Sequence, residues 1–373
     1  MRIEKMAKKL KILGIRGVPA AHGGFETFAH EFSIYLKENN WDVEVYCQQL
    51  SGDRFYQDAW NGVKRINIRV GSDSSLSSVW FDFLTILHCL REKTPCLMLG
   101  YNTAIFGVLL RIFRVPLIIN MDGIEWKRGK WGRIAKFWFW FNDWIGCLSA
   151  NRLIADNPGI EAHLATRGVR EKITMIPYGA ANIESPSFEN IRKFGVDSFE
   201  YCTLIARPEP ENSILEIVQE FSREKRNCKL LVLGDYSNPN AYKKRVLDAA
   251  SSEVVFPGAI YDKDVVSSLR YYSRIYFHGH TVGGTNPSLI EAMAAGNAVI
   301  AHGNIYNKWV LGDSGLFFID ASDLHELIST CLHDDQQLKD LRAKVKQRFL
   351  GNFTLDKIHA SYESEISKFL QDA

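Results

Sequence analysis

Short apolar runs alternate with amphipathic segments along most of the chain. Residues 10–13, 96–99 and 229–233 consist almost entirely of Leu, Ile, Val, Met and Cys, which is typical of strands buried on both faces of a parallel sheet. Residues 25–37 instead place apolar side chains at positions 25, 28, 29, 32 and 36. That spacing repeats every three or four residues and predicts a helix with one buried face.

The same two patterns recur to the end of the chain. Further strands are expected over residues 43–46, 66–70, 116–120, 152–155, 173–176, 201–205, 254–256, 275–278 and 298–301, and further helices over 79–90, 104–113, 213–221, 322–332, 336–349 and 355–369. Strands that alternate with helices form βαβ units and hence a parallel sheet. Residues 177–197 are rich in Gly, Pro, Ser and Asn and separate two such series. The pattern predicts two doubly wound α/β domains, with ligands in a crevice at the carboxyl ends of the strands.

The composition fits a globular protein of two ordinary domains. The chain has 373 residues, of which 46% are hydrophobic and 24% charged, and its net charge is +2. Nucleic acid is therefore not an expected partner. Residues 1–180 contain 24 Lys and Arg against 17 Asp and Glu, a difference of +7, whereas the remainder contains 21 against 26, a difference of −5. A basic first half suits an anionic surface, although chance asymmetry would look the same.

Cysteine usage and hydropathy indicate a cytoplasmic protein. The seven cysteines are scattered and contain no Cys-x-x-Cys pair, which is typical of buried thiols in a reducing compartment. The first ten residues lack the apolar core of a signal peptide. No stretch approaches the roughly 20 apolar residues that cross a bilayer.

Residues 278–301 carry the strongest candidate chemistry and read as a glycine loop, a helix and a strand. Gly283 and Gly284 let backbone approach a ligand closely, and residues 286–288 (Asn-Pro-Ser) have the features of a helix start. A glycine loop that opens a helix is a common anion site. Glu291, about one turn inside, suits two vicinal ribose hydroxyls. A tight turn with a solvated glutamate is the alternative.

The first glycine loop does not favour a dinucleotide. Its glycines fall at positions 14, 17, 23 and 24, which is not the Gly-x-Gly-x-x-Gly spacing. The following strand ends in Tyr46-Cys47, without the acid that holds a ribose in NAD sites.

Residues 120–144 interleave basic and aromatic side chains. The aromatic members gather around residues 137–141, and the basic members are Lys127, Arg128, Lys130, Arg133 and Lys136. Such a mixture suits a helix in a membrane interface, or contact with a pyrophosphate-linked lipid. A core helix with a solvated basic face is the alternative.

Six motifs occur in order, over residues 14–28, 120–131, 154–160, 176–180, 206–212 and 283–293. Together they resemble the rhamnosyltransferase-like branch of glycosyltransferase family four. That branch has the GT-B fold and includes bacterial capsule, O-antigen and rhamnan assembly enzymes. The resemblance covers nearly the whole chain. The ordered set is specific, whereas each motif alone is weak.

The resemblance implies an acceptor-binding Rossmann-like domain over residues 1–180 and a nucleotide-sugar-binding one over 181–354, facing a central cleft. A helix over 355–373 would pack back on the first domain. The implied activity is retaining, metal-independent and cofactor-free sugar transfer to a lipid-pyrophosphate-linked saccharide, on the inner face of the cell membrane. L-Rhamnose from dTDP-rhamnose is the expected donor group, with UDP-GlcNAc, UDP-galactose and GDP-mannose as alternative donors.

The resemblance also assigns the donor site. Glu291 matches the second Glu of the family's Glu-x7-Glu motif, while Gly283 stands at the first. Arg207 matches the Arg that pairs with the donor diphosphate, and Asn212 stands where a Lys usually follows. The backbone N–H groups that would then carry more of the sugar and phosphate contact are those of Gly284, Thr285 and Asn286. His280 or Arg16 would add positive charge.

Residues of the first domain complete the expected site. Gly23 and Gly24 would bring a helix N-terminus to the diphosphate, and Glu26 either joins them or caps that helix. Asp122 follows a strand and is expected to contact a substrate hydroxyl, with Glu125 as second candidate. The catalytic set is thus Asp122, Arg207 and Glu291. Acceptor or membrane contacts are expected from Arg16, Glu125, Trp126, Lys127, Arg128 and Trp131.

Two other classes of function remain open. A sugar-nucleotide epimerase or phosphorylase could use the same fold, but an epimerase needs a carboxylate pair or a His–acid pair at the anomeric carbon, which glycine at position 283 disfavours. A non-catalytic assembly subunit would leave glycan synthesis intact after Arg207→Ala.

Overall fold

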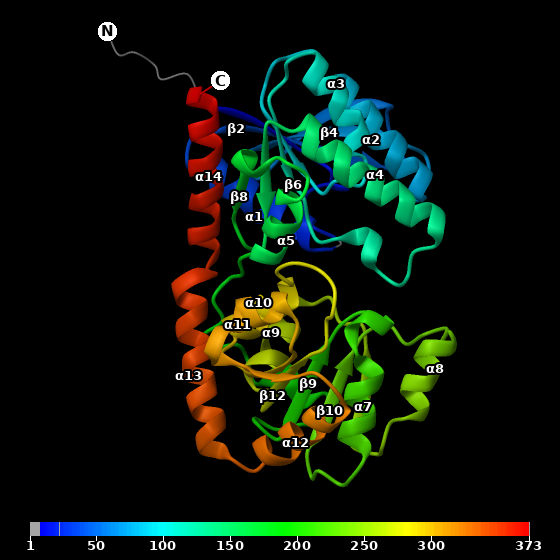
Figure 1. The fold of residues 1–373 in the computed structure, drawn as a ribbon, viewed down its shortest axis with the longest axis vertical. Helices are drawn as coiled ribbons and strands as arrows, with labels where there is room; N and C mark the ends of the chain where they lie inside the picture. The colour runs from blue at the N-terminus through cyan, green and yellow to red at the C-terminus, as the bar shows by residue number, and fades with distance from the viewer. Residues whose placement is uncertain (1–7, 22, 373) are drawn as a thin grey trace. The chain divides into compact units, whose positions relative to one another are not determined.

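The computed structural model describes residues 8–21 and 23–372, which divide into two compact units. The first contains the described residues up to Trp126, Trp131–Ile176 and those from His359 on. The second contains Lys127–Lys130 and Pro177–Ile358. Each unit is built around a mainly parallel sheet with helices packed on it (Figure 1). The predicted class, α/β with two doubly wound domains, is confirmed.

The first unit holds an eight-stranded sheet in the order β3-β4-β2-β1-β5-β6-β7-β8. Every neighbouring pair is parallel except β3 and β4. The strands are β1 (Lys9–Leu13), β2 (Asp42–Gln49), β3 (Phe55–Trp60), β4 (Val63–Arg69), β5 (Cys96–Leu99), β6 (Leu117–Asn120), β7 (Arg152–Ala155) and β8 (Ile173–Met175).

Strand β3 was not expected from the apolar pattern, and β4 begins three residues before the predicted strand. The two strands form a hairpin in which Trp60 pairs with Val63. Asn61 and Gly62 make the turn, with φ of 47° and 76°. Two successive positive φ values at Asn-Gly are the signature of a two-residue hairpin turn, so this dipeptide was the available sequence signal.

The helices of the first 176 residues cover the sheet. They are α1 (Gly23–Glu38), α2 (Ser75–Cys89), η1 (Ala104–Phe106), α3 (Gly107–Ile112), η2 (Glu125–Lys127), α4 (Arg133–Ser149), α5 (Pro158–Ala165) and η3 (Arg170–Lys172). Capping fixes several starts: Ser74 accepts from the Ser77 N–H, and Asn157 accepts from the Gly159 N–H ahead of α5. The aromatic segment over residues 120–144 is not one helix, because η2 and an irregular stretch precede α4.

The last helix, α14 (Leu355–Asp372), packs its later turns on the first unit. The Asn120 side chain at the end of β6 donates to the Tyr362 hydroxyl over 2.6 Å. The Glu363 carboxylate accepts from Trp41 Nε1 and from the Tyr35 hydroxyl, both at 2.9 Å. These bonds join the C-terminal helix to β6 and α1.

The second unit holds a six-stranded parallel sheet in the order β11-β10-β9-β12-β13-β14. Its strands are β9 (Tyr201–Ile205), β10 (Lys229–Leu233), β11 (Val254–Gly258), β12 (Ile275–His278), β13 (Ala298–His302) and β14 (Leu316–Phe318). Its helices are α6 (Glu189–Arg192), η4 (Pro210–Asn212), α7 (Ile214–Ser222), α8 (Ala241–Asp248), α9 (Lys263–Tyr271), α10 (Pro287–Ala294), α11 (Ile305–Leu311), η5 (Gly312–Ser314), α12 (Ala321–Cys331) and α13 (Asp335–Asn352).

Alternate residues of the central strands feed two separate cores. On one face, Phe277 and Ile300 pack with buried side chains of α7 and α12. On the other, Tyr276 and Val299 pack with buried side chains of α10 and α13. Because both faces are covered, these strands are apolar up to their last residues, as the sequence pattern predicts. The sheet is therefore a rigid support for the loops at its carboxyl end.

Across residues 8–21 and 23–372, no helix combines the length and the apolar character that crossing a membrane requires.

Candidate functional site

The two loops that carry the predicted donor residues follow neighbouring strands of the second sheet. Strand β9 lies between β10 and β12, so the chain continues to opposite sides of the sheet at this point. Ligands of open α/β sheets bind where the strand order reverses in this way, beside the carboxyl ends of the strands. The loop after β9 (residues 206–213) and the loop after β12 (residues 279–286) meet there.

Direct hydrogen bonds lock these two loops together. The Ser213 hydroxyl donates to the Gly279 carbonyl over 2.9 Å, and the Thr281 N–H donates to the Glu211 carbonyl over 2.9 Å. A Cβ atom at Gly279 would lie only 2.1 Å from the Asn212 carbonyl oxygen. Only glycine allows this approach, so Gly279 positions both loops, although sequence reasoning did not single it out.

Asn212 serves the loop rather than standing as a free donor-binding side chain. It is buried, and its side-chain amide donates to the Arg207 carbonyl over 2.7 Å. The Arg207 side chain itself is exposed to solvent. The residue that replaces the expected lysine therefore shapes the backbone that presents the arginine.

The predicted helix start is present, but most of its amides are already used. The Asn286 side chain accepts from the Ser288 N–H over 2.9 Å, and its carbonyl accepts from the N–H groups of Leu289 and Ile290. An anion would therefore have to meet the loop before the cap. Gly283 in that loop has a φ of 127°, and a Cβ atom there would meet nothing within 4 Å. The loop adopts a conformation that L side chains rarely reach, next to open space.

Glu291 is not a solvated glutamate, because it forms an ion pair with a buried arginine of α9. Arg270 Nη2 lies 2.6 Å from Glu291 Oε2, and the arginine side chain is only 6% exposed against 36% for the glutamate. The same Nη2 donates to the Ser288 hydroxyl over 3.0 Å, and that hydroxyl lies 3.2 Å from the Ile205 carbonyl. This network connects Glu291 to the residue where β9 gives way to the Arg207 loop.

Arg270 was missed by sequence reasoning. An arginine near the end of an amphipathic helix usually points to solvent, and nothing in the sequence marks this one as buried. Its backbone carbonyl is held by the buried Asn297 amide over 2.6 Å. Arg270 is thus fixed at its backbone by Asn297 and at its guanidinium by Glu291. It binds Oε2 of Glu291, so the rest of the partly exposed carboxylate is available to a ligand.

Two histidines stack where β12 leads into its loop. The rings of His278 and His280 lie 4.5 Å apart with an interplanar angle of 13°. Neither ring nitrogen of His278 meets a hydrogen-bonding group within the described part of the chain. Burial, reinforced by the positive charges of Arg128 and Arg207, lowers the pKa of His280 to about 3. Burial and the charge of a protonated His280 hold the pKa of His278 well below its usual value. At neutral pH both rings are uncharged, so His280 does not add the fixed cation that was considered for it.

The histidine pair predicts a loss of stability in mild acid. The unfolded chain binds protons at these rings below a pH of about 6.5. In the folded chain His280 stays neutral until near pH 3, and the pKa of His278 also lies well below its usual value. Stability is therefore unaffected above pH 6.5 and falls as the pH drops through this window. Each ring contributes up to about 1.4 kcal/mol per pH unit.

Urea unfolding at several pH values between 7.5 and 4.5 measures this slope. The His278→Phe variant keeps a ring in the stack and should show a flatter decline over the same range. The variant also removes two unpartnered ring nitrogens, which should raise stability at pH 5. An unchanged slope in this variant would exclude the histidine as its source.

The predicted residues around the first loop lie in the first unit. Gly23 and Gly24 begin α1, and Glu26 in its first turn is 7% exposed. Arg16 is exposed and pairs with Asp73 at 3.0 Å. A cavity of about 290 Å³ has Arg16, Glu26 and Asp73 among its lining residues. Arg16 and Glu26 thus face one hollow at the carboxyl ends of β1 and β2.

The strand-end acids are placed differently from each other. Asp122 follows β6, has a φ of 52° and donates its N–H to the Asn120 side chain over 2.9 Å. A positive φ is uncommon outside glycine and is often found at functional sites. Glu125 is 7% exposed, and its Oε2 accepts from Trp131 Nε1 over 3.0 Å. Glu125 and Trp131, both expected to contact the acceptor, thus bind each other through one carboxylate oxygen.

The remaining predicted contacts lie next to η2. The Trp126 ring stands 6.1 Å from the ring of His163 in α5. Lys127 and Arg128 belong to the four-residue stretch that is counted with the second unit. Among residues 8–21 and 23–372 there is no group of three or more His, Cys, Asp or Glu side chains with the geometry of a metal site.

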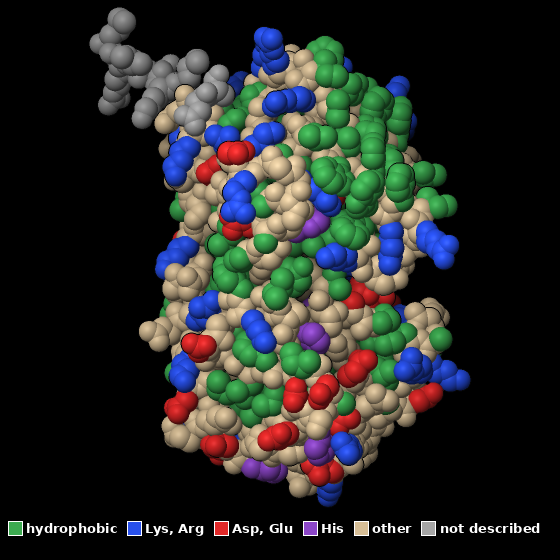
Figure 2. Space-filling view, in the orientation of Figure 1, with side chains coloured by type: hydrophobic (Ala, Val, Ile, Leu, Met, Phe, Trp, Pro, Cys, Tyr) green, Lys and Arg blue, Asp and Glu red, His purple; other side chains and the backbone are tan. Residues whose placement is uncertain are grey.

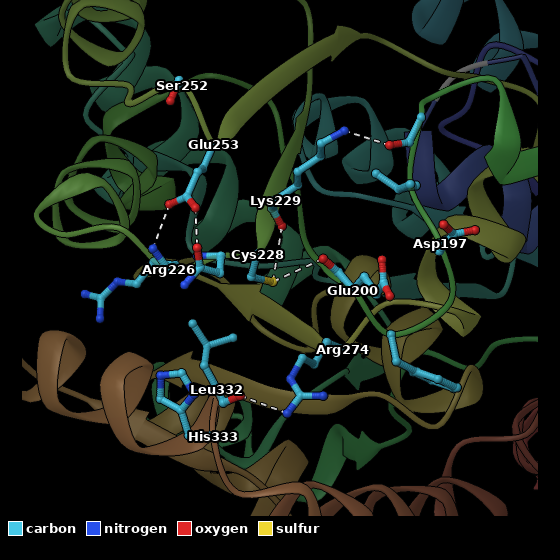
Figure 3. Close-up of a pocket in the computed structure, with 14 residues that line it drawn as sticks. Asp197, Glu200, Arg226, Cys228, Lys229, Ser252, Glu253, Arg274, Leu332 and His333 are labelled. Atoms are coloured by element: carbon cyan, nitrogen blue, oxygen red, sulfur yellow. Dashed lines mark hydrogen bonds between the residues drawn. The ribbon is translucent and has the colours of Figure 1, made fainter.

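A larger hollow of about 700 Å³ lies at the opposite, amino end of the second sheet (Figure 3). Several of its polar lining groups form structural bonds. The Glu253 carboxylate accepts from the backbone N–H groups of Arg226 and Asn227, both at 2.7 Å. Arg274 donates to the Leu332 carbonyl over 2.8 Å. Parallel sheets bind ligands at the carboxyl end, so this hollow is not the candidate donor site.

Two family models match adjacent parts of the chain. Residues 7–181 match a model described as a domain of unknown function (DUF1972). Residues 202–334 match the model described as "Glycosyl transferases group 1". The second match contains Arg207, Arg270 and Glu291. No curated protein matches the sequence.

Several solved structures share the fold. Sucrose-phosphate synthase from Thermosynechococcus elongatus has a TM-score of 0.81 at 16% identity, covering 98% of this chain and 100% of that one. HepE from Anabaena, in complex with UDP-glucose, has a TM-score of 0.74 at 15% identity, covering 96% and 99%. A UDP-forming trehalose-phosphate synthase from Burkholderia xenovorans has a TM-score of 0.73 at 13% identity, covering 97% and 100%.

At these identities the structural likeness establishes only the fold. The match of residues 202–334 identifies the kind of domain that the second unit contains. The chain has the GT-B fold, its second unit carries a group 1 glycosyltransferase domain, and the two together support a glycosyltransferase.

Proposed function

We propose that the protein transfers a sugar from a nucleotide diphosphate sugar, with retention of anomeric configuration, to a lipid-pyrophosphate-linked saccharide. The observation that carries the proposal is the joined pair of loops at the carboxyl end of the second sheet. One loop presents the exposed Arg207, and the other leads to a glutamate held by Arg270. The match of residues 202–334 to group 1 glycosyltransferases gives this arrangement its chemical meaning.

The donor class follows from the groups at hand. A guanidinium and glycine-loop amides suit a diphosphate, and a carboxylate suits two ribose hydroxyls. Structures similar to this chain contain UDP, or UDP-glucose, bound to HepE from Anabaena. These observations support a nucleoside diphosphate as the common part of the substrate.

The proposed step breaks the bond between the anomeric carbon and the β-phosphate oxygen and forms a bond from that carbon to the acceptor oxygen. The nucleoside diphosphate leaves with the electron pair. No protein nucleophile is assigned, so retention requires the acceptor hydroxyl to attack from the same face of the sugar that the phosphate leaves. The departing phosphate then takes the proton of that hydroxyl. Arg207 and the loop amides stabilise the charge on the leaving group, and Asp122 is proposed to contact a substrate hydroxyl.

The sugar, the acceptor and the cellular role are the finer part of the proposal. The ordered motifs of the rhamnosyltransferase-like branch support L-rhamnose from dTDP-rhamnose and a role in capsule, O-antigen or rhamnan assembly. The first unit would take the acceptor, with Arg16 and Glu26 lining its hollow. Because that acceptor ends in a lipid, the protein is proposed to work peripherally on the inner face of the cell membrane.

A donor panel tests this proposal. The purified protein is incubated with dTDP-rhamnose, UDP-GlcNAc, UDP-galactose or GDP-mannose and with lipid-pyrophosphate GlcNAc or glucose, and products are read by mass spectrometry. The expected product adds one deoxyhexose from dTDP-rhamnose. Hexose or HexNAc addition from another donor would replace the rhamnose assignment, and conversion of a nucleotide sugar without acceptor would indicate an epimerase instead. Failure of every donor, with a folded protein, would contradict the proposed transfer.

A further inference from the structure

Helices α2, α3 and α4 expose an unusual number of large apolar side chains. Among the described residues, sixteen large hydrophobic side chains are exposed, and nine of them lie on or directly beside these three helices. The most exposed of these nine are Ile134 at 87% and Leu76 at 83%. The nine are Leu76, Trp80, Leu87, Ile112, Phe113, Ile134, Phe137, Trp140 and Leu148, and we call them the apolar face.

The apolar face is one surface rather than a scatter of single residues. Helix α3 packs against both α2 and α4. Phe83 contacts Trp80 and Phe106, with ring centroids 5.5 and 5.2 Å apart, and Phe137 stands 5.8 Å from Trp140. In Figure 2 a broad hydrophobic field covers the region where Figure 1 places the three helices. Single exposed apolar residues are ordinary, but a continuous field of this kind marks an interaction site.

The exposed charges on the same helices are of one sign. The three helices contain only two acids, and neither is exposed. Asp82 accepts from the Thr103 hydroxyl over 2.7 Å, and burial raises its pKa to about 6. Asp143 is buried against the Arg167 guanidinium at 2.6 Å. Arg133 at the start of α4 is exposed, so the three helices offer apolar and cationic groups without an exposed carboxylate of their own. The exposed acids that flank α2, Asp73 and Glu92, pair with Arg16 and Lys11.

A basic hollow adjoins the apolar face where α3 ends. Residues 111–114 read Arg-Ile-Phe-Arg, and all four are exposed. Arg111 and Arg114 line a cavity of about 550 Å³ together with Arg152, and neither pairs with an acid among residues 8–21 and 23–372. Arg152 already has Glu365 at 3.8 Å. Burial, together with the nearby charges of Arg111 and Arg152, lowers the pKa of Lys172.

We propose that the apolar face docks the protein on an anionic phospholipid bilayer, with Arg111 and Arg114 holding headgroup phosphates. Ile112 and Phe113 stand between these arginines in sequence and would enter the acyl boundary while the guanidinium groups stay at phosphate level. Trp80 and Trp140 suit the same interfacial depth. A protein partner or a second copy of this chain would not require the three helices to lack exposed acids, whereas an anionic membrane does.

The proposed lipid-linked acceptor supplies the biological reason for docking, and to that extent this inference rests on the proposed function. The surface itself is argued from residues that do not belong to the donor site. The sequence alone suggests membrane contact through the aromatic segment at residues 120–144. The structure instead extends the proposed contact over helices α2, α3 and α4. Leu76 and Ile112 could not be assigned to a surface from spacing, because an apolar stripe on a helix usually faces the core.

Vesicle sedimentation tests the proposal on the full-length protein. Vesicles of phosphatidylglycerol and phosphatidylcholine should bind it, pure phosphatidylcholine vesicles should bind it at least tenfold more weakly, and 0.5 M NaCl should weaken the anionic binding. Arg111→Glu/Arg114→Glu and Ile134→Ser/Phe137→Ser should each reduce binding at least tenfold. The matched controls are Lys339→Glu/Lys344→Glu and Tyr261→Ser/Leu350→Ser, which alter exposed residues of the same types in the second unit and should bind as the wild type does.

Transfer to a water-soluble acceptor analogue separates this proposal from the proposed function. The two docking variants should retain that transfer while losing vesicle binding. Unchanged vesicle binding in both variants would overturn the docking face even if transfer is normal. A stable dimer in sedimentation velocity that Ile134→Ser/Phe137→Ser dissociates would also overturn it, in favour of a second copy as the occupant.

Discussion

Replacing Arg207 by alanine should lower sugar transfer by roughly 100- to 1,000-fold, the usual cost of removing one group that stabilises charge in a transition state. The exposed guanidinium stands on a loop that Asn212, Ser213 and Gly279 hold in place. Charge builds on the departing diphosphate as the anomeric bond breaks, so the loss should fall mainly on kcat. Initial rates over a range of donor concentrations measure kcat and KM separately.

Arg207→Lys is the matched variant for this experiment. It keeps the charge but loses the planar fork that bonds two phosphate oxygens, so an intermediate rate is expected. Because the side chain is exposed, neither variant should change the urea unfolding midpoint much. Near-normal kcat in Arg207→Ala would remove this residue from the catalytic set and favour a non-catalytic role for the site.

Replacing Glu291 by alanine should weaken donor binding by roughly 10- to 100-fold, as expected when a charged hydrogen-bond partner of about 1.5–3 kcal/mol is lost. Its carboxylate is held by Arg270 at 2.6 Å, so the two residues should act as a unit. Arg270→Met should therefore weaken donor binding too, although it touches no ligand itself. Isothermal titration with the donor nucleotide measures both effects.

A double-mutant cycle separates positioning from simple instability. If Arg270 acts through Glu291, then adding Arg270→Met to Glu291→Gln should weaken donor binding little further. The single Arg270→Met variant should also lose stability, because it leaves the Glu291 carboxylate and the Ser288 hydroxyl without the guanidinium that both contact. Additive losses of affinity in the double variant would show that Arg270 does not work through the glutamate.

The sequence predicted the element order because buried parallel strands and amphipathic helices have different periods. Strand β9 and strand β12 were placed to within a residue for this reason. Strand β3 was missed because its exposed, alternating side chains carry little apolar signal, although Asn61-Gly62 marked the hairpin. Local pattern thus gives the scaffold wherever burial is two-sided and is weakest at the sheet edge.

The parts of the site that could be predicted are those set by backbone preferences and by the order of the motifs. The glycine loop and the Asn286 cap follow from residue types with strong conformational preferences. The pairing of Arg270 with Glu291 joins residues 21 positions apart and depends on how α9 packs beside α10, which no local pattern encodes. The same limit applies to Glu125, because only the fold reveals that its carboxylate accepts a hydrogen bond from Trp131.

Equilibrium binding of nucleoside diphosphates tests the central claim most directly. Titration of dTDP, UDP and GDP into the wild-type protein, Arg207→Ala and Glu291→Ala gives a dissociation constant for each pair. The joined loops predict that the wild type binds at least one of the three and that both variants bind it at least tenfold more weakly. Binding of none of the three by the folded wild-type protein, or equal affinity in all three proteins, would contradict a nucleotide-sugar site at the carboxyl end of the second sheet.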